Sequence, residues 1–150
     1  MDNNNQISLN LRYSKINVLR YSQYDINSFD FTKEALIEYQ SSFQIKIIQE
    51  TSEIAILSTV KLVITETKEL FAELKVENFF ELKPFDIAVK LKDNKTEFEI
   101  PNDLLTHLTS LVVGTIRGIL HEKLKGTLLQ KEVFPLINTK ELVNLPTTDK

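Results

Sequence analysis

The chain has 150 residues, of which 42% are hydrophobic and 26% charged, with a formal net charge of −3 and no cysteine. This balance is typical of a globular protein, and the lack of cysteine excludes thiol chemistry and disulfides. Lysine and arginine form no basic stripe with interleaved aromatic residues, so we expect no nucleic-acid binding. The polar amino terminus has no signal-peptide pattern, and no apolar stretch reaches the ~18 residues of a membrane helix. The composition therefore favours a cytoplasmic protein without membrane insertion.

A single domain is expected over residues 1–150, because a chain of this length can bury a proper core. Only 3 glycines and 4 prolines interrupt it, and we see no internal linker. The end segments 1–5 and 146–150 are expected to be flexible. The chain therefore divides by its hydrophobic pattern and not by its composition.

The first part of the chain has the alternating pattern of β-strands. Apolar residues at every second position predict strands over residues 7–18, with a bulge, over 43–47 and over 70–82. A run rich in β-branched residues predicts a further strand over 53–65. The short links between the later strands predict antiparallel pairing. Residues 32–39 are a candidate helix.

The last third of the chain has a helical pattern. Residues 101–125 predict a long helix, which opens at Pro101-Asn102 and has an apolar face at helical spacing. Gly126 is well placed as its left-handed C-cap. A short amphipathic helix is expected over 139–143. Strands followed by helices indicate an α+β fold: a four-stranded antiparallel sheet, then a long helix and a short C-terminal helix.

We find no pattern of catalytic residues. His107 and His121 lie fourteen residues apart on the long helix, roughly 21 Å, so they cannot share a metal within one chain. Across a symmetric dimer of antiparallel helices they could meet, but ordinary polar surface or interface histidines are the better interpretation. There is no phosphate loop, no HExxH and no GxSxG motif. Carboxylates at a spacing of four on the fourth strand are explained by a solvated sheet face, or alternatively by a docking surface. We therefore expect no enzyme, no metal and no cofactor.

The glycines inside the long helix are unusual. Each costs ~1 kcal/mol relative to alanine, so something should offset them. They lie on a small polar face, which is either plain solvent surface or the contact with the same helix of a partner chain. The predicted oligomer interface consists of His107, Ser110, Gly114, Gly118 and His121.

Two neighbouring aromatic residues on the fourth strand must point to opposite faces of the sheet. If Phe80 enters the core, Phe79 faces outward, and with Phe71 it could form an apolar patch of the kind that marks interaction surfaces. Alternatively, both faces are covered, one by the helix and the other by a subunit.

These features together resemble the SecB export-chaperone family. In that family a long helix ends in Gly-Thr or Gly-Gly, and a seven-residue extended link leads to a proline and a short helix. The residues that match the end of this helix and the end of the fourth strand are Gly126-Thr127, Leu128 to Phe134, Pro135, Asn138, Leu142, Glu73-Leu74 and Phe80-Glu81-Leu82-Lys83-Pro84-Phe85. The resemblance covers residues 70–143, and residues 7–69 only by pattern.

The resemblance implies a holdase that binds unfolded polypeptides or preproteins in apolar grooves without ATP. It also implies a homotetramer, assembled as a dimer of dimers. The implied client groove consists of Phe79, Phe80, Leu82, Phe85, Ile137, Leu142 and Val143. The implied docking surface for a partner, on the sheet face, consists of Phe71, Glu73 and Glu77.

The chain departs from the family at the first strand. SecA, the motor that receives SecB clients, docks partly on acidic residues there, and Ile16 and Arg20 replace them in this chain. The family's Phe-Pro-Tyr-Ala-Arg-Glu helix segment is also missing. These differences argue against SecA as a partner. The alternative is an adaptor that uses the same fold to bind a specific folded partner, or a component of a toxin–antitoxin system.

Overall fold

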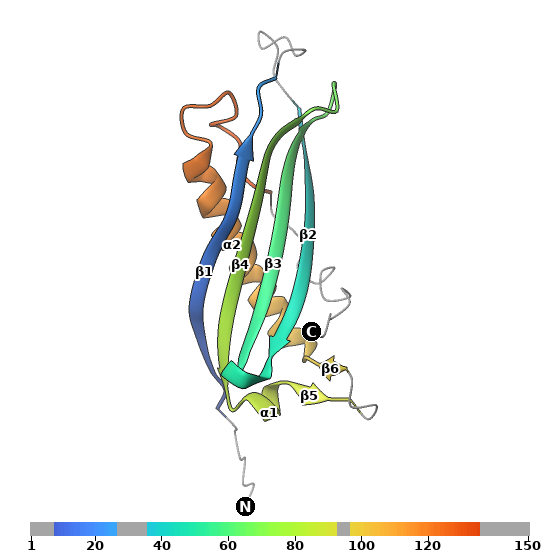
Figure 1. Cartoon of the computed structure of the whole chain (residues 1–150), viewed down its shortest axis with the longest axis vertical. Coiled ribbons are helices and arrows are strands. Elements are labelled where there is room, and N and C mark those ends of the chain that lie inside the picture. The colour runs from blue at the N-terminus through green and yellow to red at the C-terminus, as the bar shows by residue number, and fades with distance from the viewer. Residues whose placement is uncertain (1–7, 27–35, 93–96, 136–150) are drawn as a thin grey trace, which may run out of the picture.

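The computed structural model describes residues 8–26, 36–92 and 97–135. The described chain has four long strands, one long helix and several short elements (Figure 1). Their bounds are β1 Asn10–Gln23, β2 Ile37–Ile48, the 3-10 turn η1 Gln49–Thr51, β3 Glu53–Ile64, β4 Leu70–Lys83, α1 Phe85–Ala88, β5 Lys90–Leu91, β6 Phe98–Glu99 and α2 Asn102–Lys123.

The four long strands form one antiparallel sheet in the order β1-β4-β3-β2. The strands β2, β3 and β4 follow one another as hairpins, whose tight turns contain the left-handed residues Ser52 (φ 56°) and Lys68 (φ 61°). The strand β1 pairs with β4, with register shifts between Tyr13 and Lys15 and between Val18 and Arg20. Consequently β1 and β2 are the two edges of this sheet.

Helix α2 covers one face of the sheet and crosses behind it, from the side of β2 to the side of β1 (Figure 1). It begins after Pro101, whose fixed φ suits a helix start, and the apolar stripe of the helix packs on the sheet. The buried residues of α2 are Leu105, Leu108, Thr109, Val112, Val113, Ile116 and Leu120. All of them except the polar Thr109 join the buried residues of β2, β3 and β4 in one hydrophobic core.

The predicted α+β class, four antiparallel strands and long helix are confirmed. The expectation that no segment could span a membrane needs a correction. By length and composition alone, the helix Asn102–Lys123 could cross a membrane. Its apolar stripe packs on the sheet of this chain instead. A further correction is that residues 37–39 of the candidate helix 32–39 belong to β2.

Three features between and after the main elements were not predicted. The short helix α1 and the hairpin β5–β6 lie between β4 and α2. The link after α2 is a succession of turns over residues 124–131, and not an extended segment over Leu128 to Phe134. The predicted helix 139–143 and the end segments 1–5 and 146–150 lie outside the described residues.

Candidate functional site

The two neighbouring phenylalanines of β4 point to opposite faces, as predicted. Phe80 is completely buried, and its ring centroid lies 4.4 Å from that of Tyr13. Phe79 is half-buried on the outer face, where the Lys15 ammonium lies 5.6 Å from its ring centroid. The cation therefore covers part of the only one of the two rings that reaches the surface.

The predicted client groove requires a correction. Phe80 and Leu82 are both 0% exposed, so they belong to the core beneath α2 and offer no surface to a client. Phe79 and Phe85 keep accessible surface. The three remaining residues of the predicted groove, Ile137, Leu142 and Val143, lie outside the described residues.

The predicted docking surface is also changed at one residue. Phe71 is only 3% exposed, because the register between β3 and β4 shifts next to it, where Leu62 pairs with Ala72 but Val63 pairs with Leu70. A one-residue shift of this kind moves a side chain from one face of the sheet to the other.

Glu73 and Glu77 remain on the outer face, opposite Lys61 and Leu57 of β3. Both are partly exposed. The docking surface therefore keeps its two carboxylates but loses the apolar neighbour that was predicted for them.

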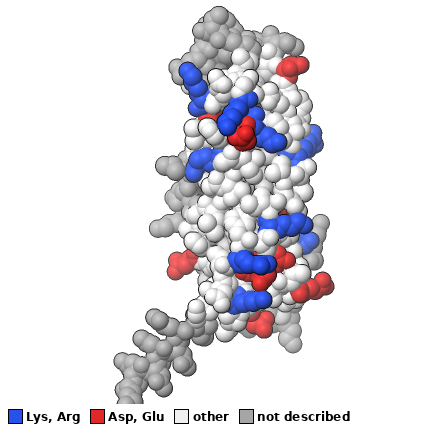
Figure 2. All heavy atoms as spheres, turned by 90° about the vertical axis from the view of Figure 1, so that its left-hand side faces the viewer, with Lys and Arg blue, Asp and Glu red and all other residues white. Residues whose placement is uncertain are grey.

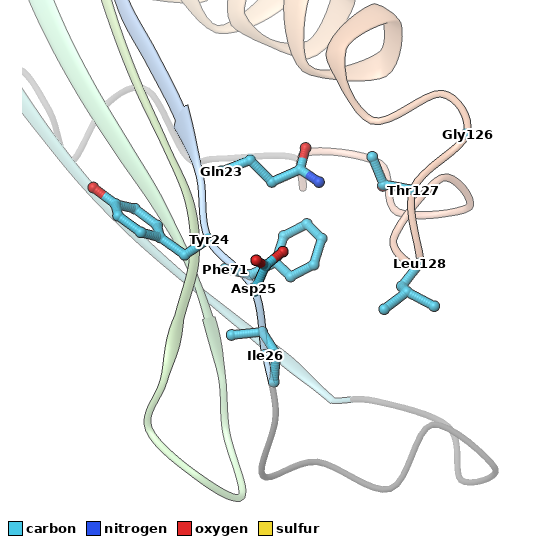
Figure 3. A pocket seen from close by; sticks show the side chains of 8 residues that line it. All are labelled: Gln23, Tyr24, Asp25, Ile26, Phe71, Gly126, Thr127 and Leu128. Carbon is cyan, nitrogen blue, oxygen red and sulfur yellow. The ribbon is translucent and has the colours of Figure 1, made fainter.

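Phe71 instead lines a cavity of about 450 Å³ at the end of the sheet where β1 and α2 both terminate (Figure 3). The end of β1 supplies one wall, and the residues after α2 supply the other. Its lining consists of Gln23, Tyr24, Asp25, Ile26, Phe71, Gly126, Thr127 and Leu128. Asp25 is its only charged residue.

The glycine-containing face of α2 is exposed along its whole length. His107, Ser110, Gly114, Gly118 and His121 all lie on the surface of the single chain. A Cβ atom built on Gly114 or Gly118 would meet nothing within 4 Å. Packing among residues 8–26, 36–92 and 97–135 therefore gives no steric reason for either glycine. The oligomer interface on this face stays a prediction.

The edge strand β1 carries exposed apolar side chains. Ile16, Val18 and Leu19 are each about half exposed, at 48%, 46% and 52%. Figure 2 views the molecule from this side: charged side chains gather towards its two ends, and a band without charge crosses the middle. A long edge strand with apolar side chains is a surface that proteins normally protect.

The segment 124–135, which we call the strap, returns from the end of α2 to the strand β2. The Tyr39 hydroxyl donates a hydrogen bond to Glu132 Oε2 (2.9 Å), and the Tyr39 ring meets the Phe134 ring edge-on, with centroids 5.6 Å apart. Arg117 of α2 donates to the carbonyl oxygens of Phe134 (2.9 Å) and Pro135 (3.2 Å). The strap is therefore held from β2 and from α2.

The electrostatics of this contact keep the Tyr39 phenol protonated. Burial raises the pKa of Tyr39 well above its ordinary value, and the neighbouring Glu132 carboxylate raises it further. The phenol can therefore donate its hydrogen bond to Glu132 throughout the physiological pH range. Sequence analysis missed this contact; the apolar residues of the link, Phe134 among them, were the one available signal.

No group of three or more metal-ligating side chains occurs in the described part of the chain. Its two histidines are held apart on α2, as predicted from their spacing.

No protein-family model matches the chain, and no curated protein matches it in sequence. Among solved structures, it is similar to the Mycobacterium tuberculosis Rv1957 SecB-like chaperone, solved in complex with a ChAD peptide from the Rv1956 HigA1 antitoxin. The TM-score is 0.53 and the identity 10%, over 85% of this chain and 90% of that chain. The fold of this chain is therefore SecB-like. A protein of unknown function from Streptococcus agalactiae matches with a TM-score of 0.41 and 10% identity, over 88% of this chain and 99% of that chain.

Proposed function

We propose that this chain is a cytoplasmic, ATP-independent chaperone that binds extended or unfolded polypeptide segments and has no catalytic activity. The SecB-like fold supports a chaperone or adaptor role, since the similar Rv1957 chaperone was solved with a bound antitoxin peptide. At 10% identity the role does not follow from the fold, so the proposal also depends on the surface of this chain.

The observation that carries the proposal is a pair of exposed apolar side chains beside β2, an edge strand of the described sheet. The strand β2 pairs on one side only within the described chain, with β3. Leu36, just before it, is 73% exposed, and Val133 of the strap is 59% exposed. The Val133 carbonyl oxygen lies 3.5 Å from the Tyr39 hydroxyl, so the strap lies beside β2. We call this border of β2, with Leu36 and Val133, the rim.

This rim suits an extended polypeptide. An extended client can lie beside β2, where exposed apolar side chains bind its hydrophobic residues with little sequence preference. The exposed middle of β2 is Gln40-Ser41-Ser42, which carries no charge. Neither a basic nor an acidic client is therefore repelled there.

Aggregation assays without nucleotide test this function. The chain is mixed with a denatured model client, and light scattering is followed as the client aggregates. We expect suppression by the wild type and weaker suppression by Leu36→Asp, because a charge beside β2 opposes burial of a client's apolar residues. Leu91→Asp is the matched control, since Leu91 is an exposed apolar residue in β5. Failure of the wild type to suppress aggregation contradicts the proposal.

A dedicated antitoxin chaperone is a second candidate. It is favoured by the antitoxin peptide in the Rv1957 complex. A dedicated chaperone binds one partner segment tightly, whereas a general holdase binds many unfolded chains weakly. Crosslinking in cells followed by identification of the captured proteins separates them. Export through SecA has less support, because Ile16 and Arg20 stand where the resemblance requires acids.

We also propose that the chain assembles with copies of itself, as a dimer of dimers. Two separate exposed surfaces support this: the apolar edge of β1 and the glycine-containing face of α2. The helix face is nearly symmetric about Gly114, with Ser110 and Gly118 four residues away on either side and His107 and His121 seven residues away.

The charges near this face also suit a twofold contact. Asp103 lies in the first turn of α2, and His121 and Lys123 lie in its last turn. An antiparallel second copy therefore brings acidic and basic ends together, which favours a self-complementary interface.

A further inference from the structure

The strap has apolar side chains on both of its sides. Leu129 and Phe134 are almost fully buried, at 5% and 2% exposed, whereas their neighbours Leu128 and Val133 are more than half exposed. The two apolar pairs stand five residues apart, in the segment Leu-Leu-Gln-Lys-Glu-Val-Phe. Such a segment has the composition of the polypeptides that the proposed chaperone would bind.

The strap covers a part of the sheet that α2 leaves open. It passes from the end of α2 behind the sheet towards β2 (Figure 1), and its contacts with Tyr39 place it there. Tyr39 pairs with Leu62 of β3, and the next residues of β2 on the same face as Tyr39 include the buried Phe43. The ring of Phe134 therefore rests at the edge of an apolar sheet surface.

Side chains, and not a shared sheet, attach the strap to the rest of the chain. Thr127, Gln130 and Glu132 donate their backbone hydrogen bonds to residues of the strap itself. At its start the strap continues from α2 through the Leu124-to-Leu120 backbone hydrogen bond and the Lys125–Glu122 ion pair. Beyond that point, the hydrogen bonds from Tyr39 and Arg117 and the buried side chains attach it to the rest of the described chain. A segment held in this way can open locally without loss of the sheet.

We propose that the strap is a built-in competitor for the client site, which Tyr39 and Arg117 hold in its closed position. This inference rests on the proposed function. In the closed position Leu129 and Phe134 occupy apolar surface that side chains of a client take, and a client binds when the strap has moved away. The apparent affinity for clients is then reduced by the fraction of molecules with an open strap.

The competition is tested by removing the Tyr39–Glu132 hydrogen bond, which we call the latch, and measuring the affinity for a client. The probe is fluorescently labelled, reduced and carboxymethylated α-lactalbumin, a permanently unfolded chain, and the readout is fluorescence anisotropy. The variant Tyr39→Phe/Glu132→Ala removes both partners of one hydrogen bond, so neither is left unpaired. We expect its Kd to fall by about fivefold, the effect of one hydrogen bond on the closed state.

The matched control is Lys125→Ala. Lys125 lies in the strap, but its ammonium pairs with Glu122 (2.8 Å) in an exposed ion pair that does not hold the strap down. Its Kd should equal that of the wild type. Hydrogen exchange should show faster exchange over residues 127–135 in the latch variant and unchanged protection in β3.

A second test uses the wild type, and it does not depend on the stability of a variant. A synthetic peptide of residues 127–135 should displace the labelled client, and the same peptide with Phe134→Ala should displace it at least about fivefold less well, since the Phe134 ring is the larger of its two buried apolar side chains.

The outcomes separate the two proposals. Tighter binding by the latch variant together with displacement by the peptide supports the inference. If the wild type binds the client, but the latch variant binds it no tighter and the peptide does not compete, the strap is not a competitor and the chaperone function stands. If the wild type binds no client at all, the proposed function fails, and the inference fails with it.

Discussion

The hydroxyl oxygen of Tyr13 in the edge strand β1 lies 3.0 Å from the hydroxyl oxygen of Thr115 in helix α2. The same Tyr13 hydroxyl donates a hydrogen bond to Asn78 Oδ1 in β4. One phenol therefore joins the edge of the sheet, its interior and the helix that covers it. Burial raises the pKa of Tyr13, which keeps the phenol neutral in this position.

Removal of this hydroxyl should destabilise the fold out of proportion to its size. Asn78 is completely buried, and its Nδ2 already has no hydrogen-bond partner among the residues that the structure describes. The variant Tyr13→Phe also leaves Oδ1 unpaired, which should cost about 1–3 kcal/mol in the free energy of unfolding. Urea denaturation measures this cost. In the variant Tyr13→Phe/Asn78→Leu no polar group is left unpaired, and the loss should be smaller than in the single variant.

The corrected position of Phe80 gives a second prediction. Phe80→Ala removes a fully buried ring and should lower the free energy of unfolding by about 3–5 kcal/mol. Phe79→Ala is the matched control, because Phe79 is the adjacent residue and is only half-buried; its cost should be clearly smaller. Equal costs for the two variants would contradict the burial of Phe80 and favour the surface groove predicted from the sequence.

The symmetric face of α2 predicts a defined pattern of crosslinks. The chain has no cysteine, so single introduced cysteines report on one contact each. If two copies cross antiparallel at Gly114, Gly114→Cys should form a disulfide-linked dimer by itself. The Cα atoms of a disulfide must lie within about 7 Å, so Ser110→Cys should link to Gly118→Cys in a mixture more readily than to itself.

The control for this pattern is Glu122→Cys, at an exposed position outside the face. Non-reducing gel electrophoresis reads all the variants. Dimers that form equally at every position, or at none of them, would show that the face is solvent surface.

Ser14, at the register shift of β1, lowers the pKa of the Glu53 carboxyl group. The Ser14 hydroxyl donates to Glu53 Oε2 (2.6 Å), and this bond, with a second from Thr51, lowers the pKa of Glu53 below its ordinary value of 4.5. Because the folded pKa is depressed, the stabilisation is present above pH 4.5 and is lost as the pH falls through the folded pKa.

Ser14→Ala should therefore move the pKa of Glu53 upwards and flatten the loss of stability on the acid side. NMR titration of the Glu53 carboxyl carbon checks the shift. An unchanged pKa in the variant would mean that the Ser14 bond does not form in solution.

The sequence predicted the elements much better than the contacts between them. Alternation identified β1, β2 and β4, a run of β-branched residues identified β3, and helical spacing with Pro101 and Gly126 identified α2, because these signals depend on neighbouring residues. The burial of Phe71 depends on a register shift between β3 and β4, which no local pattern reveals. Tyr39 and Glu132 meet across 93 positions of the chain, so their contact follows from the fold and not from either segment.

The predicted client groove failed for a related reason. The resemblance to SecB assigned Phe80 and Leu82 to a surface, while the alternation within β4 placed both on the same side as Leu74 and Val76, which α2 covers. The pattern of the chain's own residues was the better guide. The exposed apolar rim at Leu36 and Val133 had no signal in the sequence, since single apolar residues in links are common.

The most direct test of the chaperone function compares one client in two states. Titration calorimetry without nucleotide measures binding of the chain to reduced, carboxymethylated α-lactalbumin and to the native, folded form of the same protein. Binding of the unfolded form, with a negative heat-capacity change from apolar burial, and no binding of the folded form is the predicted result. Binding of the folded form alone, or of neither, would contradict the account.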